Sequence, residues 1–191
     1  LAANKSKRNF FIFSSSAAVY GNPIKVPISE EHPLNPLNPY GRTKQAAENV
    51  LKDFQNKSDN LSVACLRYFN PVGSHKSLKI GDKLNEKMDG LVSNLASSVI
   101  KESIFKVYGN DYPTKDGTAI RDFIHIEDLI DGHISAFNFL VKNNNTFDVF
   151  NLGTGTGTSI LNFIDKFNEV NFTKIKIKFN SRRQGDCIES Y

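Results

Sequence analysis

Several features are scarce in this 191-residue chain, and each absence excludes a class of protein. There are two cysteines, and Cys65 lies inside an apolar run, which argues against a disulfide framework and for a reducing compartment. No apolar run approaches the roughly 18 residues that would predict a membrane span. The net charge of +4 comes from charges of both signs, without a long basic run. We therefore expect neither nucleic acid nor a membrane as a partner, and we predict no metal site.

A dinucleotide-binding fingerprint is also missing. Gly153, Gly155 and Gly157 follow an apolar strand pattern, but their spacing is Gly-x-Gly-x-Gly rather than Gly-x-Gly-x-x-Gly. No acidic residue ends a strand about twenty residues later, where a ribose contact would require one. We therefore predict a tight turn with a Ser or Thr cap, followed by a helix over residues 160–170.

The chain does contain an apolar run that changes abruptly into hydroxyls, Phe10-Phe11-Ile12-Phe13-Ser14-Ser15-Ser16. This pattern is typical of a buried parallel strand that delivers polar side chains at its carboxyl end, where open α/β sheets bind their ligands. We expect Ser14, Ser15 and Ser16 to face a crevice there. An ordinary loop after a strand would give the same pattern, so the interpretation depends on the residues C-terminal to Ser16.

The next informative stretch combines a helix start with a pair of polar side chains. Asn38 is a favoured N-cap and Pro39 a favoured first helical residue, so a helix should begin here and run to about Gln55. Tyr40 and Lys44 are four residues apart and therefore lie on one face. An ammonium about 4 Å from a tyrosine oxygen supplies roughly the 4 kcal/mol that a phenolate needs near neutral pH, so the pair predicts a catalytic base and its tuning cation. The side chains expected to pack this helix on a sheet are Ala46, Val50, Leu51 and Phe54.

Five motifs in one order carry a resemblance to a known family. They are Ser14–Gly21, Pro39–Lys44, Leu66–Gly73, Tyr108–Thr114 and Arg121–His125. The first three resemble the extended short-chain dehydrogenase/reductases. The last two narrow the resemblance to the UDP-galactose 4-epimerases, also called UDP-glucose 4-epimerases. Because the motifs span nearly the whole chain, it is identified as a member of that family by resemblance.

The resemblance implies an α/β fold, the C-terminal part of a doubly wound, Rossmann-like parallel sheet with part of a smaller α/β substrate domain. Residues 1–72 and 119–152 would form a partial NAD-binding domain, and residues 73–118 and 153–191 a partial UDP-sugar-binding domain. The chain resembles the family only from mid-sheet onward. We therefore expect a fragment that lacks the glycine-rich half, on the order of a hundred residues at about thirty per βα unit. Members of the family typically form homodimers, and the resemblance implies a homodimer in the cytoplasm.

The resemblance also assigns residues to roles. The catalytic groups would be Tyr40, Lys44 and Ser16, the serine exchanging hydrogen bonds with the tyrosine oxygen and a substrate hydroxyl. The cofactor, NAD, would contact Ser14, Ser15, Ser16, Tyr40, Lys44 and Phe69. The UDP-sugar would contact Ser16, Tyr40, Asn70, Asn94, Leu95, Lys106, Val107, Tyr108, Arg121, Arg183, Asp186 and Ser190.

One of these residues bears on specificity. Four residues past Asp186 the family has a gate beside the 2-substituent of the sugar, a bulky Tyr in enzymes restricted to glucose and galactose and a smaller residue in enzymes that accept N-acetyl sugars. In this chain that position is Ser190, and its small volume predicts that an acetamido group fits. If the register slips by one, Tyr191 occupies the gate and the conclusion reverses.

The implied reaction is an NAD-dependent interconversion of UDP-galactose and UDP-glucose at carbon 4 through a transient 4-keto sugar. Tyr40 would take the proton of the 4-hydroxyl, directly or through Ser16. A sugar-nucleotide 4,6-dehydratase is an alternative, but it needs an acidic pair after the strand serine, where this chain has Ser15-Ser16-Ala17. A non-catalytic, NAD-binding regulatory relative is another, although such proteins typically lose the Tyr or the Lys. A third possibility is that the fragment alone has no activity.

Overall fold

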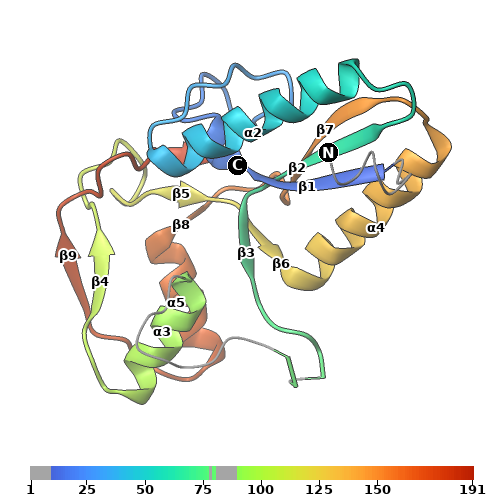
Figure 1. Cartoon of the computed structure of the whole chain (residues 1–191). Coiled ribbons are helices and arrows are strands. Elements are labelled where there is room, and N and C mark those ends of the chain that lie inside the picture. Colours follow the sequence, from blue (N-terminus) through green and yellow to red (C-terminus); the bar gives the residue numbers. More distant parts are fainter. Residues whose placement is uncertain (1–9, 78, 81–89) are drawn as a thin grey trace.

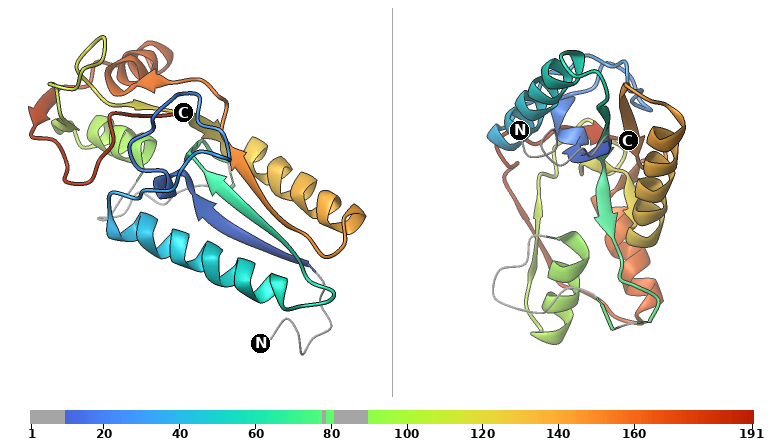
Figure 2. Two further views of the ribbon diagram at one scale, coloured as in Figure 1. Left: turned by 90° about the horizontal axis from the view of Figure 1, so that it is seen from above. Right: turned by 45° about the vertical axis from the view of Figure 1, so that its right-hand side comes forward.

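The fold is built on a parallel sheet between two helices. The computed structural model describes residues 10–77, 79–80 and 90–191. Strands β1 (Phe10–Ser16), β2 (Ser62–Tyr68) and β7 (Phe147–Leu152) form a parallel sheet in the order β1-β2-β7. Helix α2 (Pro39–Asn56) covers one face of this sheet and α4 (Ile126–Lys142) covers the other (Figure 1 and Figure 2). The predicted α/β class with a parallel sheet is confirmed.

The central strand β2 supplies a hydrophobic cluster to each face of the sheet, because successive side chains of a strand point to opposite sides. Cys65 lies in a cluster with Leu51 and Phe54 of α2. Its neighbour Leu66 lies in the cluster that includes Leu140 of α4. Both faces of the sheet are therefore packed, as the apolar character of β2 predicts.

Helices α3 (Leu91–Ile100) and α5 (Ile160–Val170) and strands β4 (Phe105–Tyr108) and β9 (Ile177–Asn180) form a smaller unit below the sheet (Figure 1). Its core joins α3, α5 and β4, whose buried side chains include Leu95, Phe105 and Ile164. Two-stranded parallel sheets pair β3 with β6 and β4 with β9, and β5 lies between β10 and β8. The bounds are η1 Ala17–Val19, β3 Asn70–Val72, α3 Leu91–Ile100, β4 Phe105–Tyr108, β5 Ile120–Arg121, β6 Phe123–His125, β8 Thr158–Ser159, α5 Ile160–Val170, β9 Ile177–Asn180 and β10 Glu189–Ser190. Residues 1–9, 78 and 81–89 of the two predicted domains lie outside the described residues.

Helix α2 begins where predicted and ends one residue later, but its buried face differs from the prediction. Asn38 is its N-cap, and the Asn38 side chain accepts a hydrogen bond from the Gly41 amide at 2.8 Å. Ala46 is exposed, and Val50 is 66% exposed, so the prediction that these two pack on the sheet is wrong. Polar side chains with partners in the core take the inner positions instead, and the buried residues are Gly41, Glu48 and Gln55.

Candidate active site

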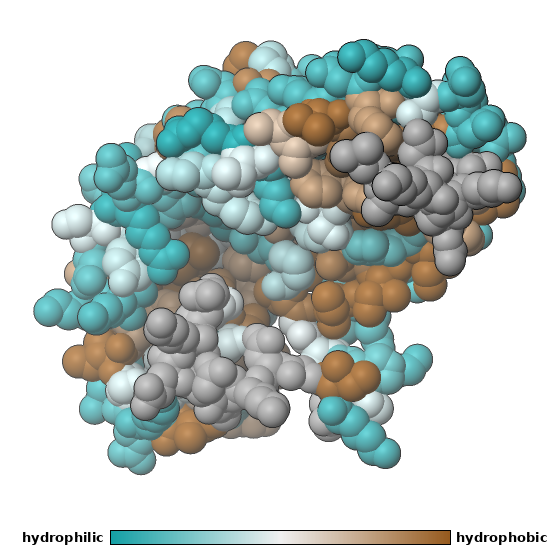
Figure 3. Space-filling view, in the orientation of Figure 1, coloured by the Kyte–Doolittle hydropathy of each residue, from teal (hydrophilic) through white to brown (hydrophobic). Residues whose placement is uncertain are grey.

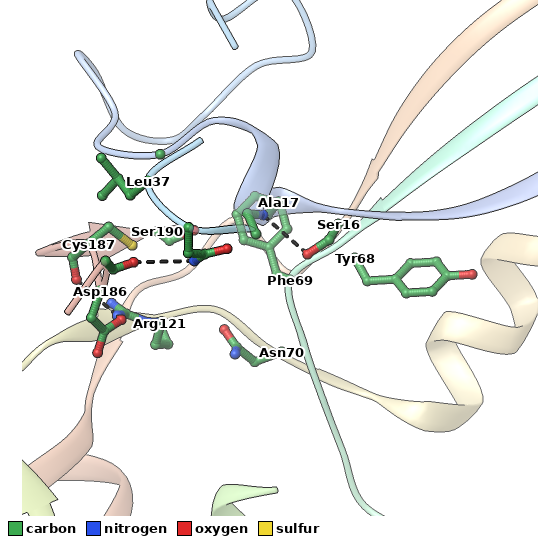
Figure 4. Close-up of a pocket in the computed structure, with 14 residues that line it drawn as sticks. Ser16, Ala17, Leu37, Tyr68, Phe69, Asn70, Arg121, Asp186, Cys187 and Ser190 are labelled. Carbon is green, nitrogen blue, oxygen red and sulfur yellow. Dashed lines mark hydrogen bonds and ion pairs between the residues drawn. The ribbon is translucent and has the colours of Figure 1, made fainter. Parts of the chain in front are cut away.

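Two adjoining pockets lie at the carboxyl ends of β1 and β2. Figure 4 shows the first of them, with Ser16 and Phe69 on one side and Arg121, Asp186 and Ser190 on the other. The second pocket extends from the first toward α3 and β4. The residues that line both are Asn70, Arg121 and Asp186, and the second pocket adds Asn94, Lys106, Val107, Tyr108 and Arg183, among others. The two pockets therefore form one groove, and most of the predicted substrate contacts line it.

Arg121 lies where the two pockets meet. Its guanidinium donates to Asp186 Oδ1 and, at 2.9 Å, to the Cys187 carbonyl oxygen, and the Arg121 side chain is largely buried. A second guanidinium, that of Arg183, stacks on the Tyr108 ring at 4.1 Å from its centroid. Guanidinium groups match the geometry of phosphate oxygens and bind them through paired hydrogen bonds. The groove is therefore chemically suited to an anionic ligand such as a diphosphate.

Tyr40 and Lys44 lie in the first turns of α2, beside the end of β1. The Lys44 ammonium donates to the Ser14 carbonyl oxygen at 2.8 Å and lies 5.6 Å from the centroid of the Tyr40 ring. The Tyr40 side chain is 55% exposed, and neither residue is among those that line the two pockets. The structure thus brings the predicted pair together and joins it to the strand that ends in Ser16.

The three serines of β1 do not share one environment. Ser16 lines the first pocket, and its hydroxyl accepts a hydrogen bond from the Ala18 amide at 3.2 Å. The Ser14 hydroxyl lies 2.7 Å from the hydroxyl of Tyr68. Ser15 is buried and donates to Glu48 Oε1. The expectation that all three side chains face the crevice is therefore wrong for Ser15, because strand alternation turns it toward α2. Only its main chain remains for the predicted NAD contact.

Two further predicted contacts are refined by the structure. Asn94 lines the second pocket, whereas the side chain of its neighbour Leu95 is fully buried in the core cluster around α3. Leu95 therefore has only its main chain for a contact with the substrate. At the gate, Ser190 lines the first pocket, whereas the Tyr191 ring lies against Gly157, where a Cβ atom would be 2.6 Å from a ring carbon. Ser190, not Tyr191, faces the first pocket.

The glycine-rich turn after β7 is already occupied by a carboxylate. The fully buried Asp122 accepts hydrogen bonds from the amides of Thr154 and Gly155, each at 2.8 Å, and from the Thr154 hydroxyl at 2.7 Å. These amides are therefore engaged and not free for a pyrophosphate. The Ser159 side chain caps α5 by accepting from the Asn162 amide, as the predicted Ser or Thr cap requires.

Three buried residues near the site escaped the sequence interpretation, namely Glu48, Arg67 and Asp122. Two of them carried a signal. Arg67 is a charged residue inside an otherwise apolar strand, and Glu48 follows Lys44 by four residues, which puts it on the same helix face. A buried charge in such a position requires a partner, so the pairing of Glu48 with Arg67 could have been predicted from sequence.

Within the described residues, no group of three or more His, Cys, Asp or Glu side chains could hold a metal ion, and no helix is long and apolar enough to cross a membrane.

The parallel sheet between two helical layers defines a Rossmann-like α/β protein, and its groove is lined by the guanidinium groups of Arg121 and Arg183. The chain belongs to the NAD dependent epimerase/dehydratase family, whose model matches residues 1–153. It is similar to the UDP-glucose 4-epimerase of Bacillus subtilis (strain 168), with 46% identity over 185 residues, which cover 94% of this chain and 53% of that protein. The resemblance predicted from the five motifs is thereby confirmed.

Solved structures give the same result. The UDP-glucose-4-epimerase from Stenotrophomonas maltophila with bound NAD and formylated UDP-arabinopyranose has a TM-score of 0.93 and 37% identity, and the match covers 100% of this chain and 56% of that one. The UDP-glucose 4-epimerase from Bifidobacterium longum in complex with NAD+ and UDP has a TM-score of 0.88 and 38% identity, covering 99% and 56%. The chain spans about half the length of the curated relatives it matches.

Proposed function

We propose that the full protein carrying this chain interconverts UDP-galactose and UDP-glucose at carbon 4 through a transient 4-keto sugar, with NAD as its cofactor. The observation that carries this proposal is the joining of Tyr40 and Lys44 to the end of β1, beside a groove with two guanidinium groups. The relatives named UDP-glucose 4-epimerase support the same reaction. The dehydratase alternative lacks support, because it needs an acidic pair after the strand serine, where this chain has Ser15-Ser16-Ala17.

The site residues divide into a set that would bind the nucleotide and a set that would carry out the reaction. Arg121 and Arg183 would hold the diphosphate, helped by the Asn94 amide along the same groove. Asp186, whose carboxylate accepts hydrogen bonds, would take the ribose of the nucleotide. Tyr40 would accept the proton of the sugar 4-hydroxyl, directly or through the Ser16 hydroxyl, and return it at the end of the reaction. The Lys44 ammonium beside the Tyr40 ring would stabilise negative charge on the tyrosine oxygen.

The residues present fit one end of the cofactor. Ser16, Tyr40, Lys44 and Phe69, with the main chain of Ser14 and Ser15, would hold the nicotinamide end of NAD, since they gather at the carboxyl end of β1 and β2. NAD, when bound, supplies the reversible oxidation of the sugar carbon. The turn after β7 offers no pyrophosphate site, because Asp122 engages its amides. We propose residues 1–72 and 119–152 as the cofactor part and residues 73–118 and 153–191 as the substrate part.

The finer assignment of substrate concerns N-acetyl sugars. We propose that the full protein also epimerises UDP-N-acetylgalactosamine and UDP-N-acetylglucosamine, because the small Ser190 lines the pocket while the bulky Tyr191 lies against Gly157. Ser190→Tyr should abolish the conversion of the N-acetyl substrates and spare that of UDP-galactose. Equal loss on both substrates would show that the gate is misplaced.

We also propose that the full protein forms a homodimer in the cytoplasm. Ala46 and Val50 are apolar residues four positions apart on the outward face of α2, which favours self-association through this helix. Both cysteines in the described part of the chain are free thiols, which fits a reducing compartment.

The decisive experiment is conversion of UDP-galactose to UDP-glucose by the full protein without added NAD, beside a Tyr40→Phe variant. We expect the parent to convert the sugar. The variant should lose turnover by orders of magnitude while UDP affinity, measured by calorimetry, stays within about twofold, because the diphosphate grip is formed by other residues. Normal turnover in the variant, or no conversion by a parent that contains NAD, would overturn the assignment.

A further inference from the structure

A buried ion pair lies directly behind the proposed catalytic groups. Glu48 of α2 and Arg67 of β2 are 3% and 4% exposed. Arg67 Nε donates to Glu48 Oε1 at 3.0 Å, and Arg67 Nη2 donates to Glu48 Oε2 at 2.6 Å, so the pair is bidentate. Both hydrogen bonds keep the two charges matched inside the core, where an unpaired charge would be costly.

This pair fixes α2 to β1 beside the reacting groups. Glu48 Oε1 also accepts a hydrogen bond from the hydroxyl of Ser15, the residue before Ser16. One helical turn earlier, Lys44 donates to the Ser14 carbonyl oxygen at 2.8 Å. Two successive turns of α2 are thus hydrogen-bonded to two successive residues of β1, which restricts the rotation of the helix about its axis.

Arg67 extends the connection to the loop that precedes α2. Its Nη1 donates to the Tyr20 hydroxyl at 2.9 Å and to the Glu30 carbonyl oxygen at 3.2 Å. The Tyr20 hydroxyl in turn donates to Asn151 Oδ1 at 2.7 Å. Arg67 is a residue of β2 and lies two residues before Phe69, which lines the first pocket. Its guanidinium therefore links this strand both to α2 and to the loop before α2.

Stability alone does not account for such a pair. Replacing a buried ion pair by apolar residues of similar volume is often neutral or stabilising, because the desolvation cost of the two charges is removed with their attraction. What apolar residues cannot reproduce is the direction of the hydrogen bonds. In this fold the hydrogen bonds of Glu48 and Lys44 hold α2 against β1 and β2. They thereby fix where Tyr40 and Lys44 lie relative to Ser16.

We propose that Glu48 and Arg67 are positioning residues that set the rotation of α2, and hence the place of Tyr40 and Lys44 relative to the end of β1. This inference rests on the proposed function, since it concerns the groups assigned to that reaction. A displacement of about 1 Å at a reacting group can lower a rate by a factor of about 100. The pair therefore acts on turnover through other side chains, without touching substrate.

The test uses the full protein with Glu48→Leu and Arg67→Met combined, so that no buried charge is left alone. We expect an unfolding midpoint at or above that of the parent. We expect kcat to fall by about 10-fold to 100-fold, while KM and the calorimetric affinity for UDP change by less than about threefold, because Arg121 and Arg183 are untouched. Amide exchange at residues 41–45 of α2 should become faster, and exchange at residues 51–55 should not.

The matched control is Gln55→Met, which removes a second buried polar side chain from the same helix face. Gln55 donates to the Leu61 carbonyl oxygen and to Asn145 Oδ1. It lies about three turns of α2 beyond Lys44 and about four beyond Tyr40. We expect this variant to lose stability and to keep the parental kcat. An unchanged kcat together with unchanged exchange at residues 41–45 in the folded double variant would overturn the positioning role, as would a kcat loss matched by loss of UDP affinity. An inactive parent would refute the proposed function, and the exchange pattern alone would then decide the positioning role.

Discussion

Cys65 illustrates how a single residue is governed by its surroundings. Burial raises the pKa of the Cys65 thiol to about 12, and the charge of Glu48 acts in the same direction. At pH 8 the thiol is therefore neutral, and only the thiolate reacts quickly. We expect no alkylation of Cys65 by iodoacetamide in the folded protein and full alkylation in urea, measured by mass spectrometry of peptides. Rapid labelling of the folded protein would contradict the burial.

Tyr112 presents a different problem, a buried hydroxyl that has no hydrogen-bond partner within the part of the chain that the structure describes. Its ring stacks under the Arg182 guanidinium, 4.2 Å from the ring centroid, and a phenylalanine would keep that contact. Tyr112→Phe should therefore stabilise the protein by about 1 kcal/mol, because it removes the desolvation cost of an unpaired group. Urea unfolding measures the change. A loss of stability instead would indicate a water held by the hydroxyl.

At this scale the sequence predicted which residues lie at the site better than how they point. Ser16, Arg121 and Asp186 line the groove as expected. The side chain of Ser15 was wrongly expected to face the crevice, and that of Leu95, a predicted substrate contact, lies in the core. A motif identifies a stretch of chain, whereas strand and helix geometry decides the direction of each side chain.

At the scale of an element, the start of α2 depends on one side chain. Asn38 Oδ1 accepts from the Gly41 amide, and its Nδ2 donates to the Gly185 carbonyl oxygen at 3.3 Å, next to Asp186. Asn38→Ala should cost about 1 kcal/mol, the usual value of an N-cap. Asn38→Asp keeps the cap and loses the donor, so it should retain stability and weaken UDP binding. Thermal unfolding and calorimetry separate the two effects, and equal behaviour of both variants would contradict this division.

The close approach of α2 to η1, the short helix that follows β1, requires a glycine. A Cβ atom on Gly41 would lie 2.5 Å from the Ala18 carbonyl oxygen, a main-chain atom that cannot turn away. Gly41→Ala should therefore push the first turn of α2 outward and lower kcat by at least about 10-fold. Arg42→Ala, an exposed change on the same turn, should leave both kcat and stability nearly unchanged. Full activity of the Gly41→Ala variant would show that the first turn of α2 can move without harm to the site.

The ends of α2 could be predicted from sequence, whereas its inner face could not. Asn38 and Pro39 are local signals, readable without any tertiary contact. The inner face depends on Glu48 and Gln55, whose partners Arg67 and Asn145 are distant in sequence. A hydrophobic pattern therefore selected Ala46 and Val50, because it treats every polar residue as solvent-facing.

On the whole molecule, one apolar surface stands out. Four residues of α4 at helical spacing, Ile130, Ile134, Phe137 and Val141, are each about half exposed. They lie near β1, which is at an edge of the described sheet, and Figure 3 shows apolar surface where Figure 1 draws α4. A free sheet edge beside an apolar stripe favours association. We expect these 191 residues, expressed alone, to self-associate in light scattering.

A matched pair of variants tests this surface. Ile134→Lys places a charge in the middle of the stripe and should remove the association through α4, leaving only that through the proposed α2 contact, so light scattering should report a smaller species. Ile24→Lys makes the same change at a loop residue that is 82% exposed and lies outside the stripe, and it should have no effect. Equal effects of the two substitutions would attribute the association to overall charge rather than to α4.

The pairing of β10 with β5 couples two tasks that are usually considered apart. Ser190 is the register partner of Arg121, so the side chain proposed to limit the sugar and the side chain proposed to hold the diphosphate lie on facing residues of two-residue strands. A shift of the main chain that enlarged the pocket at Ser190 would also move Arg121. Substrate range in this fold should therefore change during evolution by exchange of the side chain at position 190, with the main chain conserved, and a laboratory redesign that remodels this segment should lose nucleotide affinity before it gains a new sugar.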